Sequence, residues 1–175
     1  MSLKLEFVIP PEALREIGLR AAQMIRDHAR AGLGADGQPL KPYSEKPFAR
    51  PLGGITQKAR KNLGDQLTIF TTRQGKLWAI IEGGYKAFKR AAYPKDGDEV
   101  NLTATGNMAR SITLISVSPD GTLVIGASRA EEAEKLLYHS ELGAGKSRVI
   151  RDVMGLSEKE VEELAQMAAA RVRLQ

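Results

Sequence analysis

The 175-residue sequence contains no cysteine and only two histidines. It therefore has no disulfide and no thiolate ligand for a metal, and a histidine-rich metal site is not expected. Aromatic residues make up a lean 5% of the chain. No apolar run approaches the roughly 20 residues that span a bilayer, and the first residues lack the pattern of a signal peptide. These absences predict no metal, no cofactor and no membrane association, with assembly in the cytosol.

Positive charge is concentrated in the middle of the chain. From Leu40 to Lys95 there are twelve Lys or Arg against three acidic residues, a local charge of about +9, while the rest of the chain carries about −4. A surface that meets a polyanion or an acidic protein face has this pattern. A solvated loop that lysines keep soluble has it too, and both interpretations stay open.

The N-terminal half contains two patterns of regular structure and one long stretch without any. Leu3, Leu5, Phe7 and Ile9 alternate with other residues as in a half-buried strand. Apolar residues then recur every three or four positions, which predicts a helix over 12–31 that ends at Gly32. Residues 35–66 are rich in Pro, Gly, Lys and Arg and are predicted to form a long loop or arm. A hairpin is predicted over 67–82, followed by a short helix within 83–93.

The C-terminal half gives a clearer pattern. "SITLISVS" and "TLVIGAS" are joined by "PDG", which predicts a hairpin. A helix is predicted to begin at a Ser128 cap with Glu131 in a capping box, and the last helix at Ser157 with Glu160. Together the patterns predict a single α+β domain over 1–175. Its antiparallel sheet is built of hairpins and packs against an N-terminal and a C-terminal helix, with residues 35–66 as the arm and 67–82 as a hairpin insertion.

Two glycine motifs suggest nucleotide binding, and neither has the required context. "HSELGAGKSR", residues 139–148, ends like a phosphate-binding loop, but Ser140 occupies the position of the first glycine and a charged helix precedes it. "GLGADG", residues 32–37, has the spacing of a dinucleotide fingerprint, but it follows a helix instead of a strand. We therefore expect these glycines to end helices and form turns.

Candidate catalytic groups are few. His28 lies on the apolar stripe of the first helix, and His139 lies near Glu141, which could orient it as a general base. A histidine near a helix C-terminus is also simply a favourable cation site. Since no nucleophile accompanies either histidine in a recognisable motif, the sequence predicts that the protein is not an enzyme. An enzyme dependent on His139 is the remote alternative.

Nucleic-acid binding is a stronger alternative. Aromatic residues interleave with Lys and Arg in the basic middle, a mixture that can stack bases. They are Tyr43, Phe48, Trp78, Tyr85 and Phe88. No zinc-finger, helix-turn-helix or RNA-binding signature accompanies them. A stand-alone basic nucleic-acid-binding module therefore stays open as an alternative function.

The order of short motifs in the C-terminal half resembles the tailed-phage virion-morphogenesis proteins, also called tail-completion or head–tail joining proteins. "LTATGNMARSI" precedes a hairpin, "YHSELG" and an arginine follow it, and "GLS" begins the last helix. The matching residues are Gly106, Met108, Ser111, Ile112, Gly126, His139, Gly143, Arg148, Gly155 and Ser157. The resemblance covers most of the chain from residue 12 and departs from the family between about Leu52 and Gly83.

The resemblance implies a structural virion protein that forms a ring in the neck around the DNA path and joins head to tail. A tail terminator that caps tail length is an alternative. The implied partners are further copies of the chain and neighbouring neck, portal or tail proteins, with possible non-specific contact to packaged DNA. The implied location is the virion, after assembly in the host cytoplasm. Lys86, Lys89 and Arg90 are candidate DNA-facing or inter-ring contacts, and Lys146 and Arg148 are candidate subunit contacts.

Overall fold

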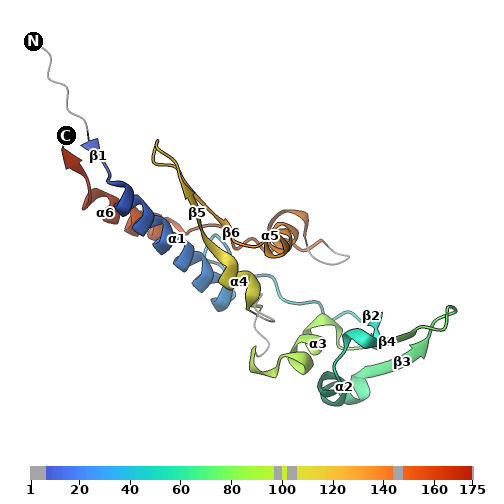
Figure 1. Ribbon diagram of the computed structural model, residues 1–175. Helices are drawn as coiled ribbons and strands as arrows, with labels where there is room; N and C mark the ends of the chain where they lie inside the picture. Colours follow the sequence, from blue (N-terminus) through green and yellow to red (C-terminus); the bar gives the residue numbers. More distant parts are fainter. Residues whose placement is uncertain (1–6, 97–99, 102–105, 144–147, 175) are drawn as a thin grey trace, which may run out of the picture. The chain divides into compact units, whose positions relative to one another are not determined.

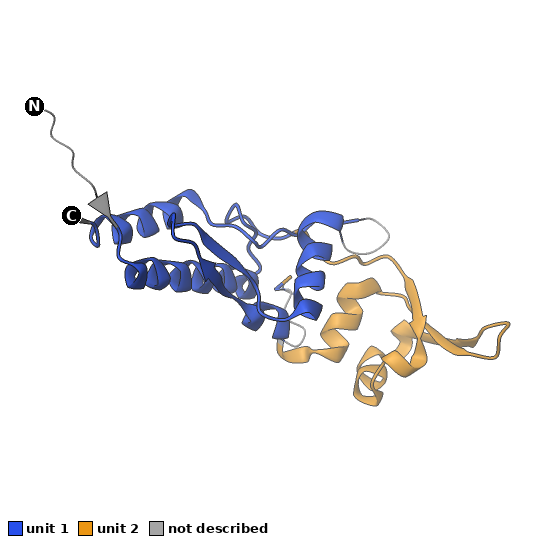
Figure 2. Cartoon of the chain, turned by 45° about the horizontal axis from the view of Figure 1, so that its top comes forward, with its two compact units in different colours: residues 1–40, 101–175 blue, residues 41–100 orange. Residues whose placement is uncertain are grey.

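A computed structural model describes residues 7–96, 100–101, 106–143 and 148–174 of the chain. The chain divides into two compact units, which Figure 2 colours separately. Unit 1 combines residues 1–40 with 101–175, and unit 2 consists of residues 41–100. The sequence patterns predicted one domain with an arm. The segment taken for an arm and its neighbour instead form a unit with its own hydrophobic core.

The α+β class with antiparallel pairing is confirmed. The described strands belong to three separate sheets, with orders β1-β7, β2-β4-β3 and β5-β6. In chain order the elements in Figure 1 are β1 (Phe7–Val8), α1 (Pro11–Ala31), β2 (Phe48–Pro51), η1 (Leu52–Gly54), α2 (Gln57–Leu63), η2 (Gly64–Gln66), β3 (Leu67–Thr71), β4 (Leu77–Ile81), α3 (Gly84–Ala92), η3 (Pro94–Asp96), α4 (Asn107–Ser111), β5 (Ile112–Val117), β6 (Leu123–Ala127), α5 (Ala130–Leu137), η4 (Tyr138–Leu142), α6 (Glu158–Ala169) and β7 (Arg173–Leu174).

Unit 1 is organised around α1. The helix begins at Pro11, whose missing N–H is not needed in a first turn, and ends at Gly32, whose φ of 71° is left-handed. The β5–β6 hairpin and α6 both pack against it (Figure 1). The core includes Ile112 and Val153, both fully buried. The predicted N-terminal helix, C-terminal helix and second hairpin are therefore confirmed.

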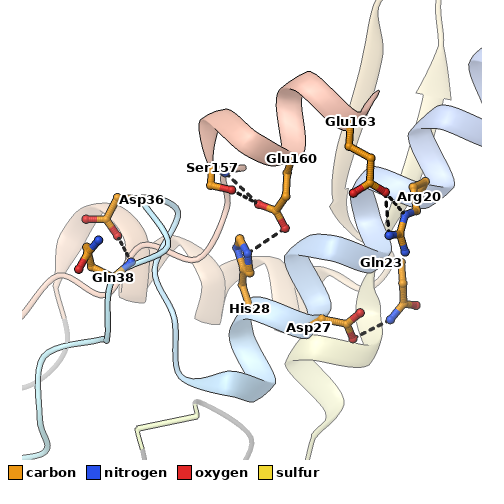
Figure 3. Close-up of polar contacts among 9 residues, drawn as sticks. All are labelled: Arg20, Gln23, Asp27, His28, Asp36, Gln38, Ser157, Glu160 and Glu163. Carbon is orange, nitrogen blue, oxygen red and sulfur yellow. Dashed lines mark hydrogen bonds and ion pairs between the residues drawn. The ribbon is translucent and has the colours of Figure 1, made fainter. Parts of the chain in front are cut away.

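Polar side chains join α1 to α6, as Figure 3 shows. The Glu160 carboxylate accepts hydrogen bonds from the backbone N–H and the hydroxyl of Ser157, at 2.9 and 2.7 Å, which confirms the predicted capping box. Its other oxygen lies 2.9 Å from Nε2 of His28 on α1. Further along the two helices, Arg20 pairs with Glu163 at 2.8 Å, and both of these side chains are exposed. One carboxylate thus caps α6 and anchors it to α1.

Replacing Glu160 by alanine is expected to lower the free energy of unfolding of unit 1 by about 1–2 kcal/mol, because the cap and the His28 contact are lost together. Glu163→Ala is the matched control on the same helix. It removes an exposed ion pair and should cost less than about 0.5 kcal/mol. Urea unfolding of both variants measures the difference. Equal losses would contradict the role assigned to Glu160.

Unit 2 is a three-stranded sheet covered by α2 and α3. Strand β4 is central and pairs antiparallel with β2 and with β3, and the β3–β4 pair is the hairpin predicted over 67–82. The core includes Ile55, Ala79 and Ile81, which are at most 1% exposed. The helix predicted within 83–93 is confirmed as α3. The unit therefore has a closed core within 60 residues.

The expectation of a loop over 35–66 was wrong in its second half. Residues 48–66 form β2, η1, α2 and η2. Helix α2 has only seven residues, and its N-cap is Thr56, whose hydroxyl accepts a hydrogen bond from the N–H of Ala59 at 3.2 Å. Elements this short carry no periodicity to detect, and packing against the β4 core stabilises them.

The predicted start of α5 was also wrong. Its N-cap is Arg129 and not Ser128, and no side-chain cap bond is present there. The backbone N–H of Ser128 instead donates to the carbonyl of Ser111 at 2.8 Å. This bond ties the end of β6 to α4, and the helix starts at Ala130.

Candidate interaction surfaces

The three basic residues predicted on α3 differ in how they present their charge. Arg90 is exposed, and Lys86 lies 2.7 Å from the carboxylate of Glu45. Lys89 is only 1% exposed, and its ammonium lies 5.0 Å from the centre of the Tyr43 ring. A side chain buried in this way cannot contact the phosphates of DNA. Lys89 is therefore a core residue of unit 2, in contrast to the prediction.

Lys86 and Arg90 line an open depression of about 660 Å³ in unit 2. Glu45, Asn62 and Gln66 also line it, together with Leu63, Gly83, Ala87, Ala91 and Pro94. The amide of Asn62 donates to the carbonyl of Ala91 at 2.9 Å and so joins α2 to α3. The depression combines an ion pair, amides and small apolar groups, and it contains no nucleophile paired with a base.

The aromatic residues of the basic middle mainly pack on one another. The ring pairs among Tyr43, Phe48, Tyr85 and Phe88 have centroid distances from 5.1 to 6.3 Å. The guanidinium of Arg50 lies 4.3 Å from the centre of the Phe88 ring. Stacking bases requires an exposed ring face. Because Phe88 is buried and Tyr43 and Phe48 are half-buried, most of this cluster forms core, and Tyr85, 38% exposed, is its one exposed ring.

Several residues of the family-like motif have structural roles within unit 1. Gly106 is the N-cap of α4. Ser111 is 2% exposed, and its hydroxyl donates to the carbonyl of Met108 at 2.7 Å. Gly155 lies against Ala35, where any side chain on residue 155 would clash. These residues position backbone segments around the core.

Gly143 and Arg148 lie where the chain leaves η4. Gly143 has a φ of 76°, and its Cα faces the backbone of Arg148 so closely that a Cβ would overlap it. Arg148 is exposed and itself has a positive φ of 45°. The prediction that the glycines of "HSELGAGKSR" end a helix and form a turn is confirmed at Gly143. Lys146 lies outside the described residues.

His139 is half-buried in η4, beside the returning chain. Its carbonyl accepts a hydrogen bond from the N–H of Arg151 at 2.7 Å. Burial, and then the positive charge of Arg151, lowers the pKa of the imidazole below its usual value of 6.5. We therefore expect a neutral ring at pH 7. The arrangement holds residue 151 beside η4, which is a packing role.

Over residues 7–96, 100–101, 106–143 and 148–174, no three His, Asp or Glu side chains gather closely enough to bind one ion. Within the same ranges, no helix combines the length and the apolar character of a membrane span.

The sequence patterns did not reveal the exposed apolar surface at the end of the β3–β4 hairpin, which runs beyond α2 and α3 (Figure 1). Ile69 and Leu77 lie on the same face of the hairpin as the buried Ala79, yet they are 50% and 54% exposed. Phe70 is 36% exposed on the opposite face, where it pairs with Trp78. Exposed apolar groups clustered in this way mark interaction surfaces. We call Ile69, Phe70 and Leu77, with Arg73 and Lys76 in the turn, the hairpin end.

A second exposed apolar surface lies on unit 1. Leu137, Tyr138 and Leu142 of α5 and η4 are 42%, 49% and 51% exposed, while Leu136 faces the core. The exposed acids Glu131, Glu134 and Glu141 lie on the same outer side of the helix by their spacing. η4 is a π-helical turn, a form that is common at functional positions. We call these six residues the α5–η4 face.

The comparisons with known proteins provide no relative. No protein-family model matches the sequence, and no curated protein or solved structure shows a significant match. The resemblance to tail-completion proteins therefore stays a prediction from motifs.

Proposed function

We propose that the chain is a structural protein of a tailed phage or prophage particle. It forms a ring in the neck, or tail-completion, region and joins head to tail around the DNA path. Its partners are further copies of itself and neighbouring neck, portal or tail proteins. It acts in the virion and assembles in the host cytoplasm.

The observation that carries this proposal is the presence of two different exposed apolar surfaces, one on each of the two compact units. A ring of identical subunits needs two unlike, complementary surfaces on each copy, because each subunit contacts one neighbour with each surface. The hairpin end and the α5–η4 face meet this requirement. The short motifs of unit 1 and the lack of a recognisable catalytic set among the described residues are compatible with the same role.

The alternative of a free nucleic-acid-binding module has less support. Unit 2 does carry twelve Lys and Arg against six Asp and Glu, a net charge of +6. However, Lys89 is buried, Lys86 pairs with Glu45, and the aromatic rings pack together. The positive charge of unit 2 is therefore better suited to an acidic protein surface, or to general attraction of DNA inside a ring.

Deleting the gene from its phage or prophage and imaging the particles tests this function. We expect DNA-filled heads beside separate tails of normal length, with recovery when the intact gene is supplied from a plasmid. Tails of irregular length would instead identify a tail terminator. Normal numbers of joined, infectious particles would contradict a role in the neck.

A further inference from the structure

We infer that the hairpin end of one copy docks onto the α5–η4 face of a second copy. The inference depends on the proposed ring, and it names the surfaces that build it. Both surfaces consist of described residues, and each belongs to a different unit of the chain. Each copy therefore offers one surface to each of two neighbours.

The apolar groups of the hairpin end require a partner. Strand β3 is an edge strand of its sheet, and Ile69, Phe70 and Leu77 leave apolar area on both faces of the hairpin in water. A flat, apolar edge is a liability that proteins cover or use for binding. The α5–η4 face offers Leu137, Tyr138 and Leu142 as a matching apolar strip.

Charge determines which partner fits. Arg73 and Lys76 are exposed in the hairpin turn, directly beside the apolar residues. The α5–η4 face carries Glu131, Glu134 and Glu141 around its apolar strip. The exposed Lys135 lies among them and pairs with the buried Glu132 at 2.8 Å, so the face remains net acidic. Opposite charges at the rim of an apolar contact set its orientation and exclude wrong partners. The complementary surface for the hairpin end is thus present on the chain itself.

A nucleic acid would fit the hairpin end less well. Phosphates could pair with Arg73 and Lys76, but they would leave Ile69 and Leu77 in water. A second copy satisfies both the charges and the apolar groups. Since the two surfaces differ, docking leaves one of each free on the pair, and further copies can add until the ring closes.

Two charge reversals make the contact testable. Arg73→Glu/Lys76→Glu makes the hairpin end acidic, and Glu131→Lys/Glu134→Lys makes the α5–η4 face basic. The mass of each purified protein is measured by light scattering over a range of concentrations. We expect the wild type to assemble beyond its monomer mass of 19.0 kDa. Each variant alone should need at least about ten-fold more protein to assemble, because its two surfaces now repel.

Mixing the two variants is the decisive step. In an equimolar mixture the acidic hairpin end of one variant meets the basic face of the other, and the remaining two surfaces are also complementary. Assembly should therefore return. Lys58→Glu/Lys61→Glu on α2 and Glu158→Lys/Glu162→Lys on α6 are matched controls with the same changes in net charge at other exposed positions. They should assemble like the wild type.

Three results would overturn the interface: a wild type that stays monomeric throughout, variants that assemble normally, or a mixture that does not recover. Circular dichroism of each variant verifies that it folds, and recovery in the mixture itself requires folded subunits. The neck role can be judged separately. Unjoined heads and tails after gene deletion, together with normal assembly of both variants, would keep the proposed function and reject this contact.

Discussion

Replacing Ile112 by alanine is expected to lower the free energy of unfolding of unit 1 by about 3–4 kcal/mol and to leave the protection of unit 2 unchanged. Ile112 has no exposed area and packs among Ile25, Met108 and Val153. Its removal loses the transfer free energy of three carbons and leaves a cavity, and both terms are large in a close-packed core. Hydrogen exchange, followed peptide by peptide, reports the two units separately.

Ile81→Ala is the matched substitution in unit 2. Ile81 is also fully buried, but in a cluster with Leu52, Ile55 and Phe88 that shares no residue with the core of unit 1. We expect a similar loss, about 3–4 kcal/mol, confined to residues of unit 2. If either variant lost protection equally over both units, the chain would unfold as one cooperative domain, and its division into two cores would be wrong.

Gly143→Ala has the second large expected effect, a loss of about 3 kcal/mol in unit 1. Two costs add at this position. An L-residue is strained at a φ of 76°, and a Cβ there would overlap the carbonyl group of Arg148 and lie 2.8 Å from its Cα. The backbone of residue 148 would have to move to make room for the Cβ. Thermal unfolding of the variant measures the loss.

Gly75→Ala separates the two costs. Gly75 has nearly the same φ, 73°, but nothing lies within 4 Å of a Cβ built there. Only the conformational strain remains, so we expect a loss of about 1 kcal/mol. Equal losses in the two variants would show that the close approach of Arg148 to Gly143 does not stabilise unit 1.

Long, periodic elements were predictable from the sequence. The apolar stripe of α1, its end at Gly32 and the Ser157–Glu160 capping box are local signals, and all three are confirmed. Both hairpins were found because their turns contain glycine between β-rich segments. In these cases the information that fixes the element lies within a few residues of it.

The rest depends on contacts between distant residues. The short elements of residues 48–66 form because β4 pairs with β2, and no local pattern records this pairing. Lys89 looked like a surface cation beside Arg90, but it lies on the side of α3 that meets Tyr43. The exposure of the hairpin end could not be predicted either, because its apolar residues would equally suit a buried strand. Whether they are covered depends on how far α2 and α3 extend along the hairpin.

The most direct test of the account is the mass of the purified wild-type protein over a wide range of concentrations. A ring built from two unlike surfaces predicts one closed species whose mass is a fixed whole multiple of 19.0 kDa, reached as concentration rises. A protein that remains at 19.0 kDa at every concentration would contradict the ring and the contact inferred between copies.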